Sequence, residues 1–223
     1  MIIPRRYNGP PDSANGGYTC GLVAGLIDAP AAAVSLRAPP PVDTELRVER
    51  DGETVRLLDG STLVAEGRPA PPPKMEPPRT VSIEEAERAS RAGLEHWAAN
   101  HPFPTCVVCG PDRDDGMGVF PGELEDSVFA ARWDGRPAPE EVWAALDCPS
   151  SAPIANFGQG PPIVLAGLRA AVERLPSEGE PLVAVSWPLG IEGRKREAAS
   201  ALLDAGGAVI ARAQALWIEL REG

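Results

Sequence analysis

The chain has 223 residues, of which 43% are hydrophobic and 24% are charged, and this composition is typical of a globular protein with an ample core. Its net charge of −11 repels polyanions and therefore argues against general binding to nucleic acid or to anionic membranes. No apolar run is long enough to span a bilayer, and residues 1–7 lack the apolar stretch of a secretory signal, so we expect a cytoplasmic protein whose four cysteines are thiols.

The first informative segment lies at residues 12–17, immediately before a short apolar run at residues 18–27. Asn15, Gly16 and Gly17 predict the start of a helix whose first turn carries almost no side chains. The first N–H groups of a helix lack internal partners and carry partial positive charge, so this end could hold an anion or a carbonyl oxygen that becomes negative during a reaction. The same pattern is also typical of a simple helix N-cap, and the residues alone leave both interpretations open.

Strand-like segments and a linker follow. We predict strands at residues 34–38, 44–50, 54–58 and 61–67, with a tight turn at Asp59-Gly60 between the last two. Residues 69–78 contain six prolines and predict a stiff, extended linker. Ser82 and Glu85 then form the pattern of a capping box, which predicts a helix from there to residue 100.

The second half repeats this order at greater length. We predict a hairpin at residues 117–120 and 128–133, then a helix at residues 140–146 that leads to Asp147 and ends at Cys148-Pro149-Ser150. Four further strands are expected at residues 163–175, 182–189, 195–203 and 208–220. Residues 57–65 also resemble residues 202–211, which indicates an internal duplication.

One helix followed by antiparallel strands, twice over, predicts an α+β fold of the double-hotdog type. In this arrangement two antiparallel sheets each wrap around a central helix, because the apolar face of a curved sheet must be covered. The expected organisation is a first hotdog repeat at residues 1–70, a proline-rich linker and connecting helix at residues 71–104, and a second hotdog repeat at residues 105–223.

Several segments resemble those of hotdog-fold acyl-CoA thioesterases. Asn15-Gly16-Gly17 is similar to their Gly-Gly helix start, and residues 106–111 with 116–118 are similar to the segment that leads into many small thioesterase-like hotdog domains. The resemblance to double-hotdog acyl-CoA thioesterases implies a catalytic aspartate at Asp147 and a catalytic glutamine at Gln214. It further implies an acyl-CoA or related thioester as substrate, no cofactor, and a monomer or homo-oligomer.

The mechanism implied by this resemblance is hydrolysis. Asp147 would activate a water molecule while the N–H groups around Gly16 and Gly17 polarise the thioester carbonyl, and Asn15 and Gln214 would orient the water or the thioester oxygen. Asp147 could equally make only a local cap or turn hydrogen bond. The first helix lacks a carboxylate, and residues 164–167 lack a hydroxyl, so a non-catalytic acyl-binding or acyl-CoA-binding hotdog protein is the alternative.

The cysteines allow a second class of function. Cys106 and Cys109 form a CxxC pair, but no second Cys or His pair with zinc-ligand spacing accompanies it, so we expect buried thiols and no metal. The two histidines, His96 and His101, lie in the connecting region and not beside Cys148, which argues against a cysteine nucleophile and against hotdog dehydratases that use histidine. A zinc-bearing or redox role for Cys106 and Cys109 is the remaining option.

One basic cluster stands out in this acidic chain. Arg194, Lys195 and Arg196 could hold the phosphates of coenzyme A, or they could simply form a solvated strand edge.

Overall fold

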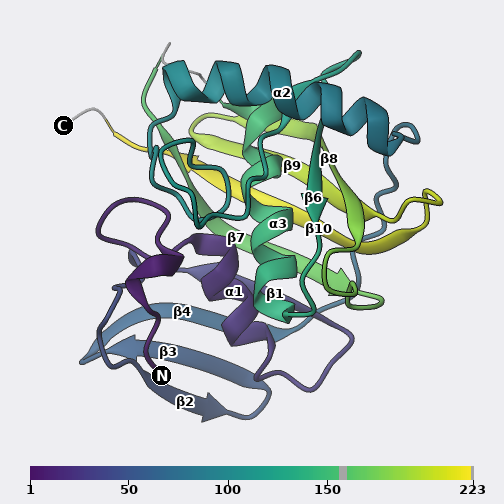
Figure 1. Ribbon diagram of the computed structural model, residues 1–223. Coiled ribbons are helices and arrows are strands. Elements are labelled where there is room, and N and C mark those ends of the chain that lie inside the picture. Colours follow the sequence, from purple (N-terminus) through teal and green to yellow (C-terminus); the bar gives the residue numbers. More distant parts are fainter. Residues whose placement is uncertain (156–159, 222–223) are drawn as a thin grey trace.

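The computed structural model describes residues 1–155 and 160–221, and it is built from a large sheet with helices on both faces (Figure 1). Its α-helices are α1 (Gly16–Ala24), α2 (Ile83–Asn100) and α3 (Pro139–Ser151), and its short 3-10 helices are η1 (Arg5–Tyr7) and η2 (Ala152–Ile154). Its strands are β1 (Ala31–Leu36), β2 (Arg47–Asp51), β3 (Thr54–Asp59), β4 (Thr62–Pro69), β5 (Gly122–Glu123), β6 (Phe129–Asp134), β7 (Ile163–Val172), β8 (Pro181–Glu192), β9 (Lys195–Leu203) and β10 (Val209–Glu219).

All the strands form one continuous antiparallel sheet in the order β2-β3-β4-β1-β7-β10-β9-β8-β6-β5. The structure therefore does not confirm two separate sheets, because the two units are joined edge to edge into one. The two halves join where β1 pairs with β7, from Ala31 opposite Ala171 to Ser35 opposite Gly167. Unpaired strand edges leave backbone N–H and C=O groups without partners, and pairing β1 with β7 satisfies both inner edges at once.

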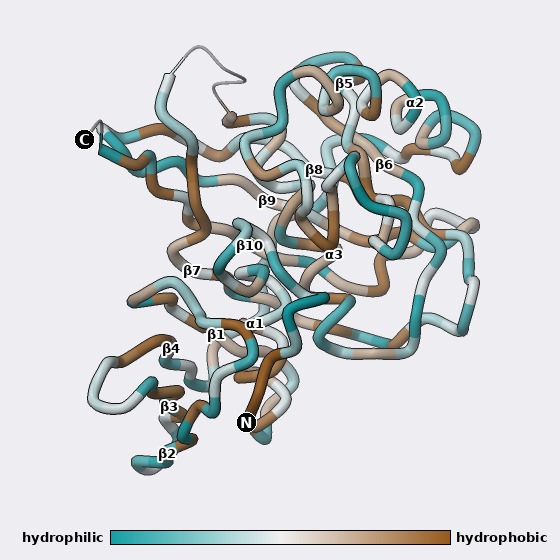
Figure 2. Tube along the Cα trace, turned by 60° about the vertical axis from the view of Figure 1, so that its left-hand side comes forward, coloured by the Kyte–Doolittle hydropathy of each residue, from teal (hydrophilic) through white to brown (hydrophobic). Residues whose placement is uncertain are grey.

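The strand order is the same on both sides of this junction. Moving outward, β1, β4, β3 and β2 on one side correspond to β7, β10, β9 and β8 on the other, as Figure 2 also shows. The two similar sequence segments fall in the hairpins β3–β4 and β9–β10, which occupy equivalent places in the sheet. The topology is thus that of one unit repeated about the β1–β7 junction.

The helices divide between the two faces of the sheet. α1 and α3 cover one face, whereas α2 packs on the opposite face against β5, β6 and β8 (Figure 1). Along β8 the side chains alternate accordingly: Ser186 donates to the carbonyl of Pro149 in α3 at 2.7 Å, and its neighbours Val185 and Trp187 join the apolar cluster beneath α2. The predicted capping box begins α2, because Ser82 Oγ accepts from Glu85 N and Glu85 Oε2 accepts from Ser82 N.

Two local predictions differ from the structure. Residues 117–120 are not a strand, and the short strand that pairs with β6 is instead Gly122–Glu123. α3 does not end at Cys148-Pro149-Ser150 but continues through Pro149 to Ser151. Strand side chains hold this part of α3, since Ser200 Oγ donates to Leu146 O at 2.6 Å and Ser186 Oγ donates to Pro149 O. Among the described residues, no helix is long and apolar enough to cross a membrane.

α1 and α3 cross at very short range because α1 presents glycines to α3. A Cβ atom added at Gly17 would lie 2.3 Å from Asp147 Cβ, and one added at Gly21 would lie 2.5 Å from Glu140 Cα. Both distances are too short for carbon atoms, so any side chain at these two positions would push the helices apart. The glycines of the N-terminal helix therefore set the distance between the two halves on this face of the sheet.

Replacing Gly21 tests this crossing. Gly21→Ala should lower the free energy of unfolding by about 1–3 kcal/mol, because the new methyl group meets the α3 backbone. Gly25→Ala is the matched control: Gly25 ends the same helix with a φ of −61°, and its added Cβ would come no closer than 3.4 Å to a neighbour. Urea unfolding of both variants checks this, and equal stability of the two would contradict a close helix crossing.

Candidate functional site

Asp147 lies in the buried C-terminal half of α3, where the sheet and the helix itself fix its backbone. Ser150 Oγ donates to Asp147 O at 2.6 Å, and Trp217 of β10 donates from Nε1 to Ser150 Oγ at 2.9 Å. The Asp147 side chain is only 1% exposed. A carboxylate in such a place is uncommon, because burying a charge is costly unless the charge has a partner.

The partner of Asp147 comes from the other half of the chain. Gly17 N in the first turn of α1 donates to Asp147 Oδ2 at 2.8 Å, so the start of α1 holds one carboxylate oxygen. The other oxygen, Oδ1, is buried and has no hydrogen-bond partner among the described residues. Asp147 therefore has one oxygen held by Gly17 and one buried oxygen without a hydrogen-bond partner among the described residues, which is uncommon in a folded protein.

The surroundings of Asp147 favour its protonated form. Burial raises the pKa of Asp147 from 3.8 to about 7, while the hydrogen bond from Gly17 opposes this rise and the nearby Cys106 adds to it. A carboxyl group with a pKa close to neutrality can accept and return a proton during a reaction.

Gly16 occupies the first position of α1 and lines the same cavity as Asp147. Within the described part of the chain, no hydrogen bond engages its backbone N–H. The two glycines thus differ: Gly17 holds Asp147, and Gly16 offers a free donor at the positive end of the helix. The sequence alone does not distinguish these two glycines.

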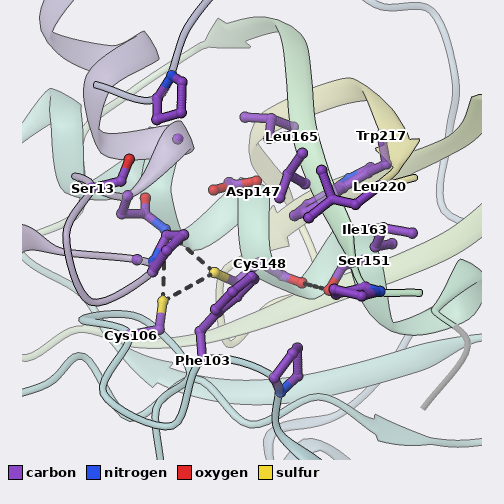
Figure 3. A pocket seen from close by; sticks show the side chains of 18 of the residues that line it. Ser13, Phe103, Cys106, Asp147, Cys148, Ser151, Ile163, Leu165, Trp217 and Leu220 are labelled. Carbon is purple, nitrogen blue, oxygen red and sulfur yellow. Dashed lines mark hydrogen bonds between the residues drawn. The ribbon is translucent and has the colours of Figure 1, made fainter. Parts of the chain in front are cut away.

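The cavity has a volume of about 680 Å³ and is lined mostly by apolar residues. Asp147 lies at its wall with the β7 residue Leu165 and the β10 residue Trp217 nearby, while Phe103 reaches in from the segment after α2 (Figure 3). A cavity of this size and polarity suits the apolar part of a small organic ligand. No hydroxyl side chain comes from residues 164–167, in agreement with the sequence.

Asn15 joins the start of α1 to a group of cysteines. Its Oδ1 accepts from Tyr18 N at 2.8 Å, which is the N-cap interaction that the sequence predicts. Its Nδ2 lies 3.5 Å from Cys148 Sγ and 3.8 Å from Cys106 Sγ. Both ends of the Asn15 amide are therefore engaged within the protein, and its geometry is that of a residue that positions α1.

The cysteine group itself was missed by the sequence analysis. Cys148 on α3 joins Cys106 and Cys109, and their Sγ atoms all lie within 4.8 Å of one another. His101 also reaches this group, with Nε2 3.2 Å from Cys109 Sγ, although the sequence placed it only in the connecting region. The sulfur neighbours Cys109 and Cys148 hold the pKa of the Cys106 thiol well below its usual range, in opposition to burial. No local spacing relates Cys148 to the CxxC pair, so only the fold reveals the group.

Gln214 is not brought to the site. Its neighbour Ala213 pairs with Ser200, whose hydroxyl points at α3, so Gln214 points to the opposite face of the sheet. There Gln214 Nε2 donates to Glu197 Oε2 at 3.1 Å, and its Oε1 accepts from Arg169. The resemblance places Gln214 at the site only if the turn before β10 is one residue shorter, and a shift of one residue reverses every side chain of a strand.

The basic cluster lies at the β8–β9 turn, and none of its three residues is among those that line the cavity. Arg194 donates to Glu219 O at 3.0 Å, and Arg196 donates to Ile154 O at 3.0 Å and pairs with the Glu219 carboxylate. Lys195 is exposed. Two of the three cations are thus engaged with the chain itself.

Comparison with solved structures identifies the fold. A hotdog-fold protein of unknown function from Alicyclobacillus acidocaldarius is 13% identical and has a TM-score of 0.61, with 99% of this chain and 92% of that chain covered. The chain has the hotdog fold. Two thioesterases are similar over the same extent. The acyl-CoA thioesterase II TesB2 from Mycobacterium marinum is 11% identical and has a TM-score of 0.56, with 100% of this chain and 92% of that chain covered. A candidate thioesterase II from Thermobifida fusca is 16% identical and has a TM-score of 0.62, with 99% of this chain and 91% of that chain covered.

A protein described by another activity is similar in structure as well. A dehydratase domain of a mycocerosic acid synthase-like polyketide synthase is 14% identical, with a TM-score of 0.59 and 97% of this chain covered. No protein-family model matches the sequence, and the comparison with curated proteins found no significant match. At these identities the comparisons establish the hotdog architecture, and the chemistry must be argued from the residues of the site.

Replacing Asp147 with asparagine should make the free energy of unfolding depend less on pH. Since the pKa of Asp147 is raised from 3.8 to about 7, the folded wild type keeps its proton between these values while the unfolded chain loses it. Wild-type stability should therefore fall by up to about 1.4 kcal/mol per pH unit across this window from this group alone. The asparagine of Asp147→Asn does not titrate, so this variant does not lose stability in the same way. Its free energy of unfolding relative to that of the wild type should rise from pH 4 to pH 7 and then level off.

Urea unfolding at several pH values measures this difference. Asp12→Asn is the matched control, because the Asp12 side chain is 98% exposed and loses the same charge. A difference between Asp147→Asn and wild type that stays constant with pH would show that the carboxyl is not buried as described.

Proposed function

We propose that this hotdog protein hydrolyses thioesters of the acyl-CoA type, with Asp147 as the general base and the N–H of Gly16 as the donor that stabilises the oxyanion. The observation that carries this proposal is the Asp147 carboxylate. Gly17 fixes one of its oxygens at 2.8 Å, and the other is buried, unpartnered and beside a largely apolar cavity.

The chemistry follows from these positions. A water molecule bound to Asp147 Oδ1 gives up a proton to the carboxylate as its oxygen attacks the thioester carbonyl carbon. The carbonyl oxygen becomes negative, and the Gly16 N–H at the positive end of α1 lowers the energy of this charge. The carbon–sulfur bond then breaks, and coenzyme A leaves as a thiolate that takes the proton.

Asn15 has a supporting role in this proposal. It caps α1 through Tyr18 N, so it fixes the direction of the Gly16 and Gly17 N–H groups. A direct contact of Asn15 with water or substrate is not needed, and Gln214 has no part in the reaction because it lies on the other face of the sheet. Hydrolysis is preferred over a histidine-dependent dehydration, since His101 is engaged at both nitrogens by Phe103 N and Cys109 Sγ.

The site also gives a reason for the domain organisation that we propose. Residues 1–70 and 105–223 would each form one hotdog unit, and residues 71–104 would connect them. The first unit supplies the start of α1, and the second supplies Asp147 and most of the β7 and β10 wall. The catalytic arrangement would then exist only where the two units meet.

Substitution of Asp147 tests the base. Asp147→Asn keeps the size of the side chain but cannot accept the proton, so turnover of acyl-CoA substrates of several chain lengths should fall by about 10²–10⁴-fold. Binding of the same acyl-CoA, measured by calorimetry, should persist. Gln214→Ala should retain wild-type turnover within about twofold. Acyl-CoA binding by wild type without any turnover would support the non-catalytic alternative and overturn the proposal.

Substitution of Gly16 tests the oxyanion donor. Proline is tolerated at the first position of a helix and removes its N–H, and the preceding Asn15 has the extended backbone (φ −60°, ψ 135°) that a following proline requires. Gly16→Pro should therefore lower kcat by about 10²–10³-fold relative to Gly16→Ala, which keeps the N–H while adding a side chain at the same place. Equal activity of the two variants would exclude the Gly16 N–H from the reaction.

A further inference from the structure

Three buried cysteines from two distant parts of the chain converge on one wall of the cavity. Cys106 and Cys109 lie in the segment between α2 and β5, and Cys148 lies on α3 next to Asp147. The Sγ atoms of Cys106 and Cys148 are 3.7 Å apart, and Figure 3 shows these two sulfurs facing each other. All three Sγ atoms lie within 4.8 Å of one another.

The loop that carries two of these sulfurs is held in a fixed shape. Gly110 N donates to Cys106 O at 2.8 Å, and a Cβ atom at Gly110 would lie 2.5 Å from both Cys106 N and Cys106 O, so only glycine fits there. Arg113 fastens the loop to the N-terminal segment by donating to Thr105 O and Asn8 Oδ1. The two sulfurs are therefore presented by a tight, anchored turn, and α3 brings the third.

We propose that Cys106, Cys109 and Cys148 together bind one zinc ion. Zinc bound by cysteine has a zinc–sulfur distance of about 2.3 Å and a tetrahedral arrangement, which places neighbouring sulfurs about 3.8 Å apart. The 3.7 Å between the sulfurs of Cys106 and Cys148 matches this spacing, and the third sulfur is within a small side-chain movement of it. Thiolates are soft ligands that favour zinc over magnesium or calcium.

The groups around the sulfurs are suited to negatively charged ligands. The Asn15 amide directs its Nδ2 at the sulfurs of Cys106 and Cys148. His101 accepts from Phe103 N at Nδ1, so its ring proton lies on Nε2 and is donated to Cys109 Sγ at 3.2 Å. Both are hydrogen-bond donors to sulfur, as expected for residues that support metal-bound thiolates.

His101 is consequently not the fourth ligand, because a metal-bound Nε2 could not keep its proton. All three cysteines line the cavity, so the fourth position of the metal faces the cavity. An open fourth position with three protein ligands holds water or another exchangeable ligand. The sequence shows no second Cys or His pair with zinc-ligand spacing, so it predicts no metal, and the third cysteine of the group comes from α3.

Metal analysis of the purified full-length chain tests this site directly. Protein produced with zinc in the medium should contain about one zinc per chain after desalting. Protein stripped under reducing conditions should bind one Co²⁺ and show the intense near-ultraviolet absorption of thiolate-to-cobalt charge transfer. Cys106→Ser, Cys109→Ser and Cys148→Ser should each weaken metal binding by at least tenfold.

Cys20→Ser is the matched control, because Cys20 is the fourth buried cysteine of the chain and lies in the core outside the group. This variant should retain wild-type metal content, and so should His101→Gln. Circular dichroism and thermal unfolding of every variant would separate loss of metal from loss of fold. Cys148→Asp restores a zinc-binding side chain, so metal titration of this variant should show a higher affinity than that of Cys148→Ser.

Three outcomes would overturn the proposal. These are wild-type protein that neither retains zinc nor binds Co²⁺ with thiolate absorption, a folded Cys148→Ser variant with wild-type affinity, and a Cys106–Cys148 disulfide in freshly purified protein. Loss of metal from His101→Gln as complete as from Cys148→Ser would overturn the three-cysteine ligand set. None of these readouts depends on thioesterase activity, so the metal site and the proposed function can fail separately.

Discussion

The hydrogen bond from Gly17 N to Asp147 Oδ2 is the contact on which the candidate site depends. It joins the first turn of α1 to the C-terminal half of α3 at 2.8 Å, and it holds one oxygen of the carboxyl group of a residue that is only 1% exposed. Such a short distance between two helices requires that α1 carry no side chain at Gly17 or Gly21. The glycines therefore serve two purposes at once: they bring the helices together, and they leave the positive end of α1 open to the cavity.

Much of this arrangement could be predicted from the sequence because the relevant signals are local. Asn15 followed by two glycines predicted the capped start of α1, and Ser82 with Glu85 predicted the start of α2. The alternating strands and the turn at Asp59-Gly60 predicted the hairpins, since both depend on neighbours in the chain. The resemblance of Asp147 to a catalytic aspartate also pointed to a residue that the fold buries beside the cavity.

Other features could not be predicted because they depend on contacts between distant segments. The pairing of β1 with β7 turns two expected sheets into one, and nothing within either strand specifies its partner. The face of Gln214 depends on the register of β10, including irregular pairing near Val209 and Leu216, so its side chain lies opposite to the expected side. Cys148 meets the CxxC pair only because the fold brings α3 beside the anchored loop, which no spacing rule describes.

The repeated topology does not repeat the candidate site. A twofold relation about the β1–β7 junction would call for a second carboxylate on α1 facing the start of α3. The sequence of α1 (Gly16–Ala24) contains no acidic residue, and the first turn of α3 carries the acidic residues Glu140 and Glu141, which disfavour a second anion there. Each copy of the chain accordingly holds one candidate site, to which one unit contributes the carboxylate and the other the start of a helix.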